Sequence, residues 1–268
     1  MYTNSQSKKQ CVYWLKMALK GDVEEPIQSR QDKAYFHLLR RILSGALPAG
    51  TPLPEALLAK QLGISRTPLR EAIRRLAAEG FLRQIPNRGS IVAEFSKRDI
   101  GELYELREAL EVYAIGKAAE CTLRPQDLEN LQRLVADVLT LRDELVASGE
   151  PGLSAEQMQR FVQVDLSFHT TLVRTAANRF ILKAFADTRV LLNIFAMRRK
   201  GHSAELLAEI HIYHSEVLAA VVRRDPVAAM RLMGEHIRLS QQERLREYDE
   251  WERDALLDRT SQLTEAAL

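Results

Sequence analysis

The stretch 55–89 constrains the fold more than any other part of the sequence. It contains two short segments with apolar residues at helical spacing, 54–62 and 66–79, joined by a Gly-Ile-Ser turn. Ser65 stands at the N-cap position of the second segment, and Gly80 follows its end as a C′ glycine. Two helices joined by about three residues form a helix-turn-helix, so we expect this fold here.

The two segments differ in what their faces carry. The first is expected to bury Leu57, Leu58 and Leu62, whereas the polar face of the second is crowded with Arg66, Thr67, Arg70, Arg74 and Arg75. The N-terminal end of a recognition helix enters the major groove, and arginine can bind guanine O6 and N7 or hold phosphates. We therefore expect a DNA-recognition helix; the alternative is an ordinary helical hairpin with a solvated basic face.

A β-hairpin is expected directly after these helices. Residues 81–85 and 90–95 have the composition of short strands, and the turn between them contains Arg88 and Gly89. An earlier segment, 31–45, has apolar residues on one helical face. Together these elements predict a winged helix over residues 27–95.

The run GISRTPLREA, which begins at Gly63, closely resembles the signature of GntR-family bacterial transcription regulators, and the similarity extends over about 35–89. The resemblance implies a double-stranded DNA operator as partner and a DNA-binding set of Ser65, Arg66, Thr67, Arg70, Arg74, Arg88 and Gly89. Many relatives carry an arginine where this chain has Ala56. The operator sequence should therefore not be copied from a relative.

Charge is distributed unevenly along the chain. Residues 1–95 contain 15 Lys/Arg and 8 Asp/Glu, whereas the remainder contains 23 and 28. A basic part followed by an acidic part is typical of a nucleic-acid module joined to a module that does not bind DNA. The 268 residues are enough for about two such domains.

Cysteine content and hydropathy indicate the cellular compartment in which the protein is expected. Cys11 and Cys121 are too few for a disulfide framework, which favours a reducing, cytoplasmic location. No run of about 18 apolar residues is present, so no membrane contact is expected. Residues 1–26 form an extension in which lysines interrupt a short apolar run, and we expect an amphipathic helix or a disordered arm there.

Every long segment after residue 96 has helical periodicity. The expected helices are 97–121, 125–149, 154–177, 179–200, 203–223 and 225–248, with breaks at Pro, Gly or capping residues. Six helices with short connections predict an all-α antiparallel bundle over 96–248, followed by a charged tail, 249–268, that can extend the last helix. The expected fold class is mainly α: a winged helix-turn-helix and then a helical bundle.

The segment YELREALE, which begins at Tyr104, resembles the opening helix of the FadR-type C-terminal domain called FCD. The similarity spans about 97–240. It implies a helical bundle that binds a small effector, often an organic acid, and that commonly forms a homodimer. A dimer presents two recognition helices, so a palindromic operator is expected.

Four polar side chains project from the apolar faces of three expected helices: Asp165, His169, His214 and His236. Burying unpartnered polar groups is costly, and either a shared metal ion or separate hydrogen bonds to neighbours would remove that cost. The spacing alone leaves both alternatives open. His211, one turn before His214, is the competing ligand, and His37 and His202 are expected at the surface.

The resemblance favours the metal ion. Many FCD domains carry Asp-x-x-x-His on one helix and one histidine on each of the last two, and the four residues named above match that pattern. It implies a divalent ion, with zinc first and nickel or manganese as alternatives, because mixed oxygen and imidazole ligands suit all three.

An arginine in the first bundle helix is the candidate effector ligand. Arg107 is either a surface residue paired with Glu111 one turn on, or a clamp for an effector carboxylate, which arginine binds with two parallel hydrogen bonds. In FCD domains an arginine in this region often serves as such a clamp. Arg189 and Asn193, also one turn apart, are further candidates for the same cavity.

The expected function is a ligand-responsive transcription regulator rather than an enzyme. A metalloenzyme built on the bundle, with accessory DNA binding, is an alternative because three histidines and a carboxylate can hold a catalytic metal. However, no Glu-x-x-His, phosphate-binding loop or nucleophile–base pair is present. A third alternative is a bundle that only dimerises and binds no ligand.

Overall fold

The computed structural model describes residues 29–43, 46–86, 89–94, 96–196 and 201–265, which separate into two compact units. One contains residues 29–96 together with 189–196, and the other is built from 97–188 and the helices after residue 200. The mainly α fold class, a winged helix-turn-helix followed by a helical bundle, is confirmed. The extension expected at residues 1–26 lies outside the described residues.

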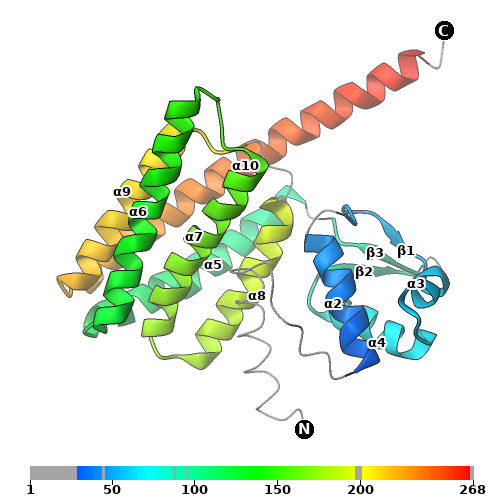
Figure 1. Ribbon diagram of the computed structural model, residues 1–268, viewed down its shortest axis with the longest axis horizontal. Coiled ribbons are helices and arrows are strands. Elements are labelled where there is room, and N and C mark those ends of the chain that lie inside the picture. The colour runs from blue at the N-terminus through cyan, green and yellow to red at the C-terminus, as the bar shows by residue number, and fades with distance from the viewer. Residues whose placement is uncertain (1–28, 44–45, 87–88, 95, 197–200, 266–268) are drawn as a thin grey trace. The chain divides into compact units, whose positions relative to one another are not determined.

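The first unit packs three helices against a small sheet (Figure 1). The helices are α2 (Arg30–Leu43), α3 (Glu55–Leu62) and α4 (Arg66–Ala78), and the strands are β1 (Pro52–Leu53), β2 (Leu82–Ile85) and β3 (Gly89–Val92). The antiparallel sheet has the order β1-β3-β2. β1 was not predicted, because two residues are too few to show strand alternation.

The core of this unit lies between α2 and α4. Tyr35, Leu38 and Leu39 of α2 are fully buried, as are Leu69 and Leu76 of α4. Burial of these aromatic and aliphatic side chains contributes roughly 1.5–3 kcal/mol for each of them. This packing fixes the orientation of α4, so that its polar face is turned towards solvent.

The apolar face of α3 differs from the predicted one. Leu58 and Leu62 are buried with Ala59, but Leu57 is 52% exposed, so its predicted burial is wrong. An eight-residue helix turns only one narrow stripe towards the core, and Leu57 lies outside that stripe. Gly63, in the left-handed conformation with φ 64°, ends α3 as the turn requires.

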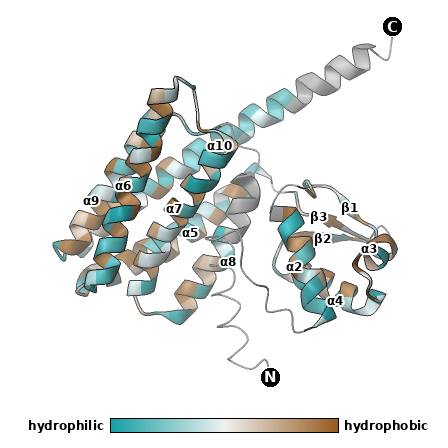
Figure 2. Cartoon of the chain, viewed as in Figure 1, coloured by the Kyte–Doolittle hydropathy of each residue, from teal (hydrophilic) through white to brown (hydrophobic). Residues whose placement is uncertain are grey.

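The second unit is a bundle of long helices. They are α5 (Lys97–Glu120), α6 (Pro125–Ser148), α7 (Ala155–Thr175), α9 (Ala204–Val222) and α10 (Pro226–Glu265), together with the part of α8 (Arg179–Ala196) up to residue 188. α10 continues 17 residues beyond the predicted end at 248, since no helix breaker interrupts the charged tail. Its last part extends beyond the other bundle helices and is predominantly hydrophilic where Figure 2 is coloured.

Local signals set the beginnings of the bundle helices. Ser154 forms a capping box with Gln157 at the start of α7, and Ser203 caps α9. α5 packs against α7, α9 and α10, so these four helices enclose a common interior. None of the described helices is long and apolar enough to cross a lipid bilayer.

Candidate functional site

The four polar residues predicted to share a metal lie together in the bundle interior. Asp165 and His169 come from α7, His214 from α9 and His236 from α10, and one potential ligand atom of each lies within 4.8 Å of all the others. The Nε2 atom of His236 is 3.2 Å from that of His169 and 3.3 Å from that of His214. The nearest Asp165 oxygen is 3.4 Å from His169 Nε2 and 3.6 Å from His214 Nε2.

Burial and ring packing hold these imidazoles in place. All three rings are at most 1% exposed, whereas Asp165 keeps 18% of its side chain accessible. Phe168 of α7 stacks on the His214 ring with centroids 4.1 Å apart, and His169 stacks on His236 at 5.2 Å. This packing brings the three Nε2 atoms within reach of one ion, as a preorganised metal site requires.

The donor set fits a divalent metal ion. Three imidazole nitrogens and one carboxylate oxygen suit zinc, nickel or manganese. Burial lowers the pKa of His236 well below its usual value, and the neighbouring His214, His169 and Arg107 lower it further. A metal ligand must be a neutral imidazole, so this environment favours the binding form. Among the described residues, His236 Nδ1 has no hydrogen-bond partner.

Glu111 of α5 is part of this site, although the sequence did not assign it there. Its carboxylate accepts a hydrogen bond from Arg107 Nε at 2.6 Å and contacts His169 Nδ1 on its other oxygen. A carboxylate on Nδ1 fixes the tautomer that leaves Nε2 free for a metal. The available signal was the i, i+4 pairing of Arg107 and Glu111 on a helix face that also carries Leu103, Leu110 and Ala114.

Arg107 is buried rather than a surface residue, with 3% of its side chain exposed. Its Nη2 lies 3.3 Å from His169 Nε2, so the guanidinium reaches the cluster. Although burial by itself lowers the pKa of Arg107, the Glu111 carboxylate raises it above the usual arginine value. A permanent cation therefore stands beside the potential ligand atoms.

The remaining side chains considered in the sequence analysis of the bundle lie in different surroundings. His211 is half-buried, and its Nδ1 lies 3.1 Å from the Val135 carbonyl oxygen, away from the cluster. His202 was expected at the surface, but it is buried against Phe161 with centroids 4.8 Å apart, so that expectation is wrong. Arg189 is buried on α8, and the Asn193 side chain lies outside the described residues.

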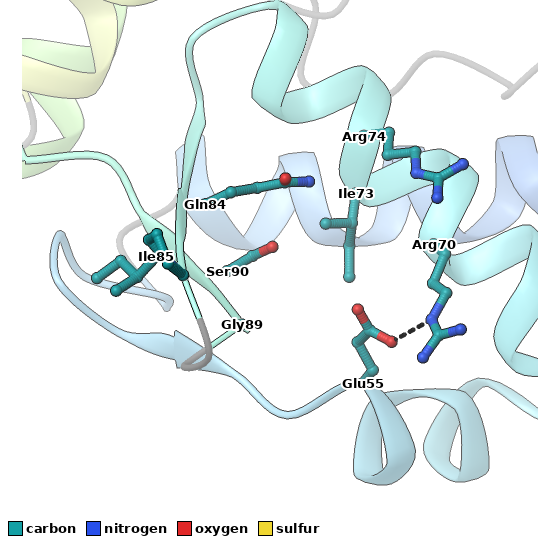
Figure 3. Close-up of a pocket in the computed structure, with 9 residues that line it drawn as sticks. Glu55, Arg70, Ile73, Arg74, Gln84, Ile85, Gly89 and Ser90 are labelled. Atoms are coloured by element: carbon teal, nitrogen blue, oxygen red, sulfur yellow. Dashed lines mark hydrogen bonds and ion pairs between the residues drawn. The ribbon is translucent and has the colours of Figure 1, made fainter.

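The predicted DNA-binding residues occupy one exposed stripe of the first unit. Arg66, Thr67, Arg70 and Arg74 of α4 are all exposed, and Gly89 begins β3 with φ 83°. Arg88, expected at the wing tip, lies outside the described residues. Figure 3 shows Arg70 and Arg74 beside a pocket between α3, α4 and the wing.

Two residues near this stripe differ from the expectation. Arg75 lies over the Tyr35 ring at 3.7 Å and pairs with Glu79 and Asp32, so it joins α4 to α2 rather than facing DNA. Ser65 occupies the N-cap position of α4 with extended backbone, but its side chain makes no capping hydrogen bond. Ser65 is exposed, which leaves its hydroxyl available to a ligand.

Each of the two units matches a known protein family or domain. Residues 30–92 match the family described as bacterial regulatory proteins, gntR family, and residues 102–239 match the FCD domain. The chain is 34% identical over 171 residues to the Nta operon transcriptional regulator of Aminobacter aminovorans, covering 63% of this chain and 74% of the relative. It is 28% identical over 160 residues to the gluconate operon transcriptional repressor of Bacillus licheniformis, covering 60% of each.

Solved structures share the same architecture. E. coli McbR/YncC matches with a TM-score of 0.64 and 23% identity, covering 83% of this chain and all of that one. A GntR regulator from Rhodococcus sp. RHA1 matches with a TM-score of 0.58 and 22% identity, covering 81% of this chain and 98% of that one. At these identities the likeness concerns the fold alone.

Proposed function

The chain belongs to the gntR family of bacterial regulatory proteins and carries an FCD domain, and from this premise we propose that it is a ligand-responsive regulator that binds a palindromic operator as a homodimer. Family membership makes it a DNA-binding transcription regulator and not an enzyme, which removes the metalloenzyme alternative. The single observation that carries the ligand-responsive part is the convergence of three imidazoles and one carboxylate inside the bundle.

We propose that Asp165, His169, His214 and His236 hold one divalent ion. Zinc is the first candidate, with nickel or manganese as alternatives. The ion would act as a Lewis acid that binds an effector oxygen. Because the ligands come from three helices, its binding free energy would also stabilise the bundle.

The charges of the site support an anionic effector. Arg107 and Glu111 neutralise each other, the three imidazoles must be neutral to bind metal, and Asp165 supplies one negative charge. A divalent ion would leave the buried site with one net positive charge, which is unfavourable away from water. One carboxylate would neutralise it, and Arg107 stands close enough to His169 to bind that carboxylate as well.

The metal is tested by elemental analysis of protein purified without a nickel column. We expect about one equivalent in the wild type, and His214→Ala should lose most of it. His211→Ala is the matched control, because His211 faces the Val135 carbonyl, and it should keep the metal. Metal well below one equivalent that added zinc, nickel or manganese does not restore would refute the site.

The effector class is tested with a sugar acid and an uncharged sugar. Gluconate carries a carboxylate and D-xylose does not, and relatives are named for the corresponding operons. We expect gluconate, but not D-xylose, to raise the melting temperature of the metal-loaded protein, and Arg107→Met to abolish the shift. Equal shifts of the melting temperature with gluconate and D-xylose, or a gluconate shift that does not depend on metal, would contradict a carboxylate-binding metal site.

The DNA-binding role is tested by operator affinity. Arg66→Ala or Arg70→Ala should cost about 1–3 kcal/mol if the side chain reads a base. Arg75→Ala provides a contrast, since Arg75 contacts Tyr35, Glu79 and Asp32 inside the unit. Fluorescence anisotropy in which neither Arg66→Ala nor Arg70→Ala lowers affinity would remove both residues from recognition.

A further inference from the structure

We propose that Glu55 is a positioning residue for DNA recognition: its carboxylate holds the Arg70 guanidinium in one orientation, so that Arg70 discriminates between bases instead of attaching to any phosphate. The inference rests on the proposed recognition role of Arg70. It concerns the specificity of that contact, which the exposed arginine stripe alone leaves undetermined.

Glu55 and Arg70 form an ion pair that connects the two helices of the helix-turn-helix. Glu55 is the first residue of α3, and its Oε2 accepts a hydrogen bond from Arg70 Nε at 2.7 Å. The Arg70 side chain is 56% exposed and that of Glu55 is 29% exposed. A partly sheltered carboxylate thus accepts a hydrogen bond from the Nε end of a guanidinium that faces solvent.

Packing does not fix the orientation of Arg70. Its side chain borders an open pocket of about 640 Å³, lined also by Ile73, Arg74, Gln84 and Ser90 (Figure 3). An arginine beside open space has many rotamers, and fixing one costs roughly 0.5–1.5 kcal/mol when it binds. The hydrogen bond that Arg70 donates to Glu55 restricts those rotamers before DNA binds.

The bond also leaves the right donors available. The hydrogen bond to Glu55 uses Nε–H, so the N–H groups on both terminal nitrogens remain for a ligand. Two parallel N–H bonds to guanine O6 and N7 are the commonest specific base contact of arginine. At the same time the carboxylate charge opposes the approach of a backbone phosphate, which lowers non-sequence-specific attachment at this point.

Arg66 and Arg74 provide an internal contrast on the same stripe. Neither makes a side-chain hydrogen bond or ion pair within the part of the chain that the structure describes, although both are as well placed on the exposed face. Flexible unpaired arginines suit phosphate contacts, which carry no sequence information. Glu55 therefore distinguishes Arg70 from its neighbours.

The test is selection of binding sites by the 268-residue chain from a duplex DNA library with a randomised core, followed by affinity measurement on the selected duplexes. Wild type is compared with Arg70→Ala, Glu55→Ala, Glu55→Asp, Glu55→Gln and the double variant Glu55→Ala/Arg70→Ala. The aspartate keeps the charge but is one methylene shorter, and the glutamine keeps an oxygen at the same reach. Thermal unfolding of each variant serves as the folding control, and Glu55→Asp replaces Glu55→Ala should the alanine variant fail to fold.

We expect Arg70→Ala to lose a base preference at one operator position, and Glu55→Ala and Glu55→Asp to reduce discrimination at that same position roughly 2–10-fold. Glu55→Gln should retain the base preference at that position, because its amide oxygen still accepts from Nε, but it should bind DNA without the preferred site more tightly, because it lacks the carboxylate charge. The double variant should match Arg70→Ala, since Glu55 acts through Arg70.

Two outcomes overturn the inference while leaving the role of Arg70 intact. In one, every Glu55 variant selects the wild-type motif with at most a uniform change in affinity. In the other, Glu55→Ala loses preference at a position that Arg70→Ala keeps, which would mean that Glu55 reads a base itself. If Arg70→Ala selects the wild-type motif, the proposed recognition role of Arg70 fails as well, and that result is distinct from the other two.

Discussion

Glu111 is the residue that connects the metal cluster to its buried cation. One carboxylate oxygen accepts from Arg107 and the other contacts His169 Nδ1, so a single side chain sets the tautomer of a ligand and the position of the guanidinium. Carboxylates that orient metal-binding histidines typically change metal affinity 10–100-fold when they are removed.

Glu111→Gln should therefore weaken metal binding about 10–100-fold. The neutral amide cannot replace the carboxylate both as the acceptor for His169 Nδ1–H and as the negative charge that balances Arg107. The His169 ring therefore loses its fixed tautomer. Competition with a chromogenic chelator measures the change. Glu108→Gln is the matched control on α5, since Glu108 pairs with Arg238 away from the cluster, and equal losses in both variants would contradict the assignment.

His202 gives the bundle a sensitivity to acid. Burial lowers its pKa from 6.5 to about 4, while the charge of Asp165 acts in the opposite direction. The folded-state pKa lies below the unfolded one, so stability is fully present above pH 6.5 and is lost as the pH falls towards 4. From pH 7.5 to pH 5 this histidine should account for about 2 kcal/mol of lost stability.

The His202→Gln variant tests this contribution. Urea unfolding in the presence of EDTA should give a wild-type loss between pH 7.5 and pH 5 that exceeds the loss in the variant by about 2 kcal/mol. The chelator removes metal release as a second source of pH dependence. If the free energy of unfolding fell equally with pH in the two proteins, protonation of His202 would not be what destabilises the bundle.

At the scale of the element, the start of α7 matters because this helix carries Asp165 and His169. The capping box of Ser154 and Gln157 satisfies backbone groups at its N-terminus. Ser154→Ala should destabilise the bundle by about 1 kcal/mol. Ser65→Ala is the matched control, because Ser65 occupies an N-cap position without a capping bond and should cost little.

Calorimetric unfolding of the two serine variants measures this difference. The transition of the bundle should shift down in Ser154→Ala, and the transition of the winged helix should stay unchanged in Ser65→Ala. A wild-type melting profile for Ser154→Ala would show that tertiary packing alone fixes the start of α7. Reduced DNA affinity of Ser65→Ala at unchanged stability would support its predicted place among the DNA-binding residues.

At the scale of the whole molecule, the proposed homodimer needs an apolar surface. Leu106 and Tyr113, two turns apart on α5, are 46% and 49% exposed. Met230 of α10, also exposed, packs against Gly116 one turn beyond Tyr113. Exposed apolar side chains grouped on neighbouring helices are typical of an interaction surface.

The double variant Leu106→Glu/Tyr113→Glu should convert the dimer to a monomer, because it places two carboxylates in the proposed interface. Light scattering at micromolar concentration measures the mass. Val146→Glu is the matched control at a position on α6 that is also exposed. A monomeric wild type, or a dimer that persists in the double variant, would exclude this surface as the interface.

Effector and operator binding should be coupled in the proposed dimer. A ligand changes DNA affinity only if it binds the DNA-competent and incompetent states unequally. A typical coupling of about 1–3 kcal/mol corresponds to roughly 5–150-fold in operator affinity. An acid that binds the metal-loaded protein tightly and leaves operator affinity unchanged is not the inducer.

The sequence by itself determined the two modules and the bounds of their helices to within a few residues, except at the end of α10; the predicted end of α8, at 197–200, lies outside the described residues. The reason is that helix ends depend on neighbouring residues: Gly63 ends α3, Pro125 begins α6, and Ser154 and Ser203 cap α7 and α9. It also singled out Asp165 and His169 as neighbours, because residues four apart share a helix face.

Only the tertiary structure decided which faces are buried and which side chains meet. Leu57 is exposed, His202 is buried and Arg75 contacts Tyr35, and each outcome depends on which helix lies opposite. The meeting of three Nε2 atoms from α7, α9 and α10, and of Glu111 with His169, depends on packing between segments far apart in the chain. Such contacts leave no periodic signal, since they are fixed by the shape of the assembled core rather than by local preference.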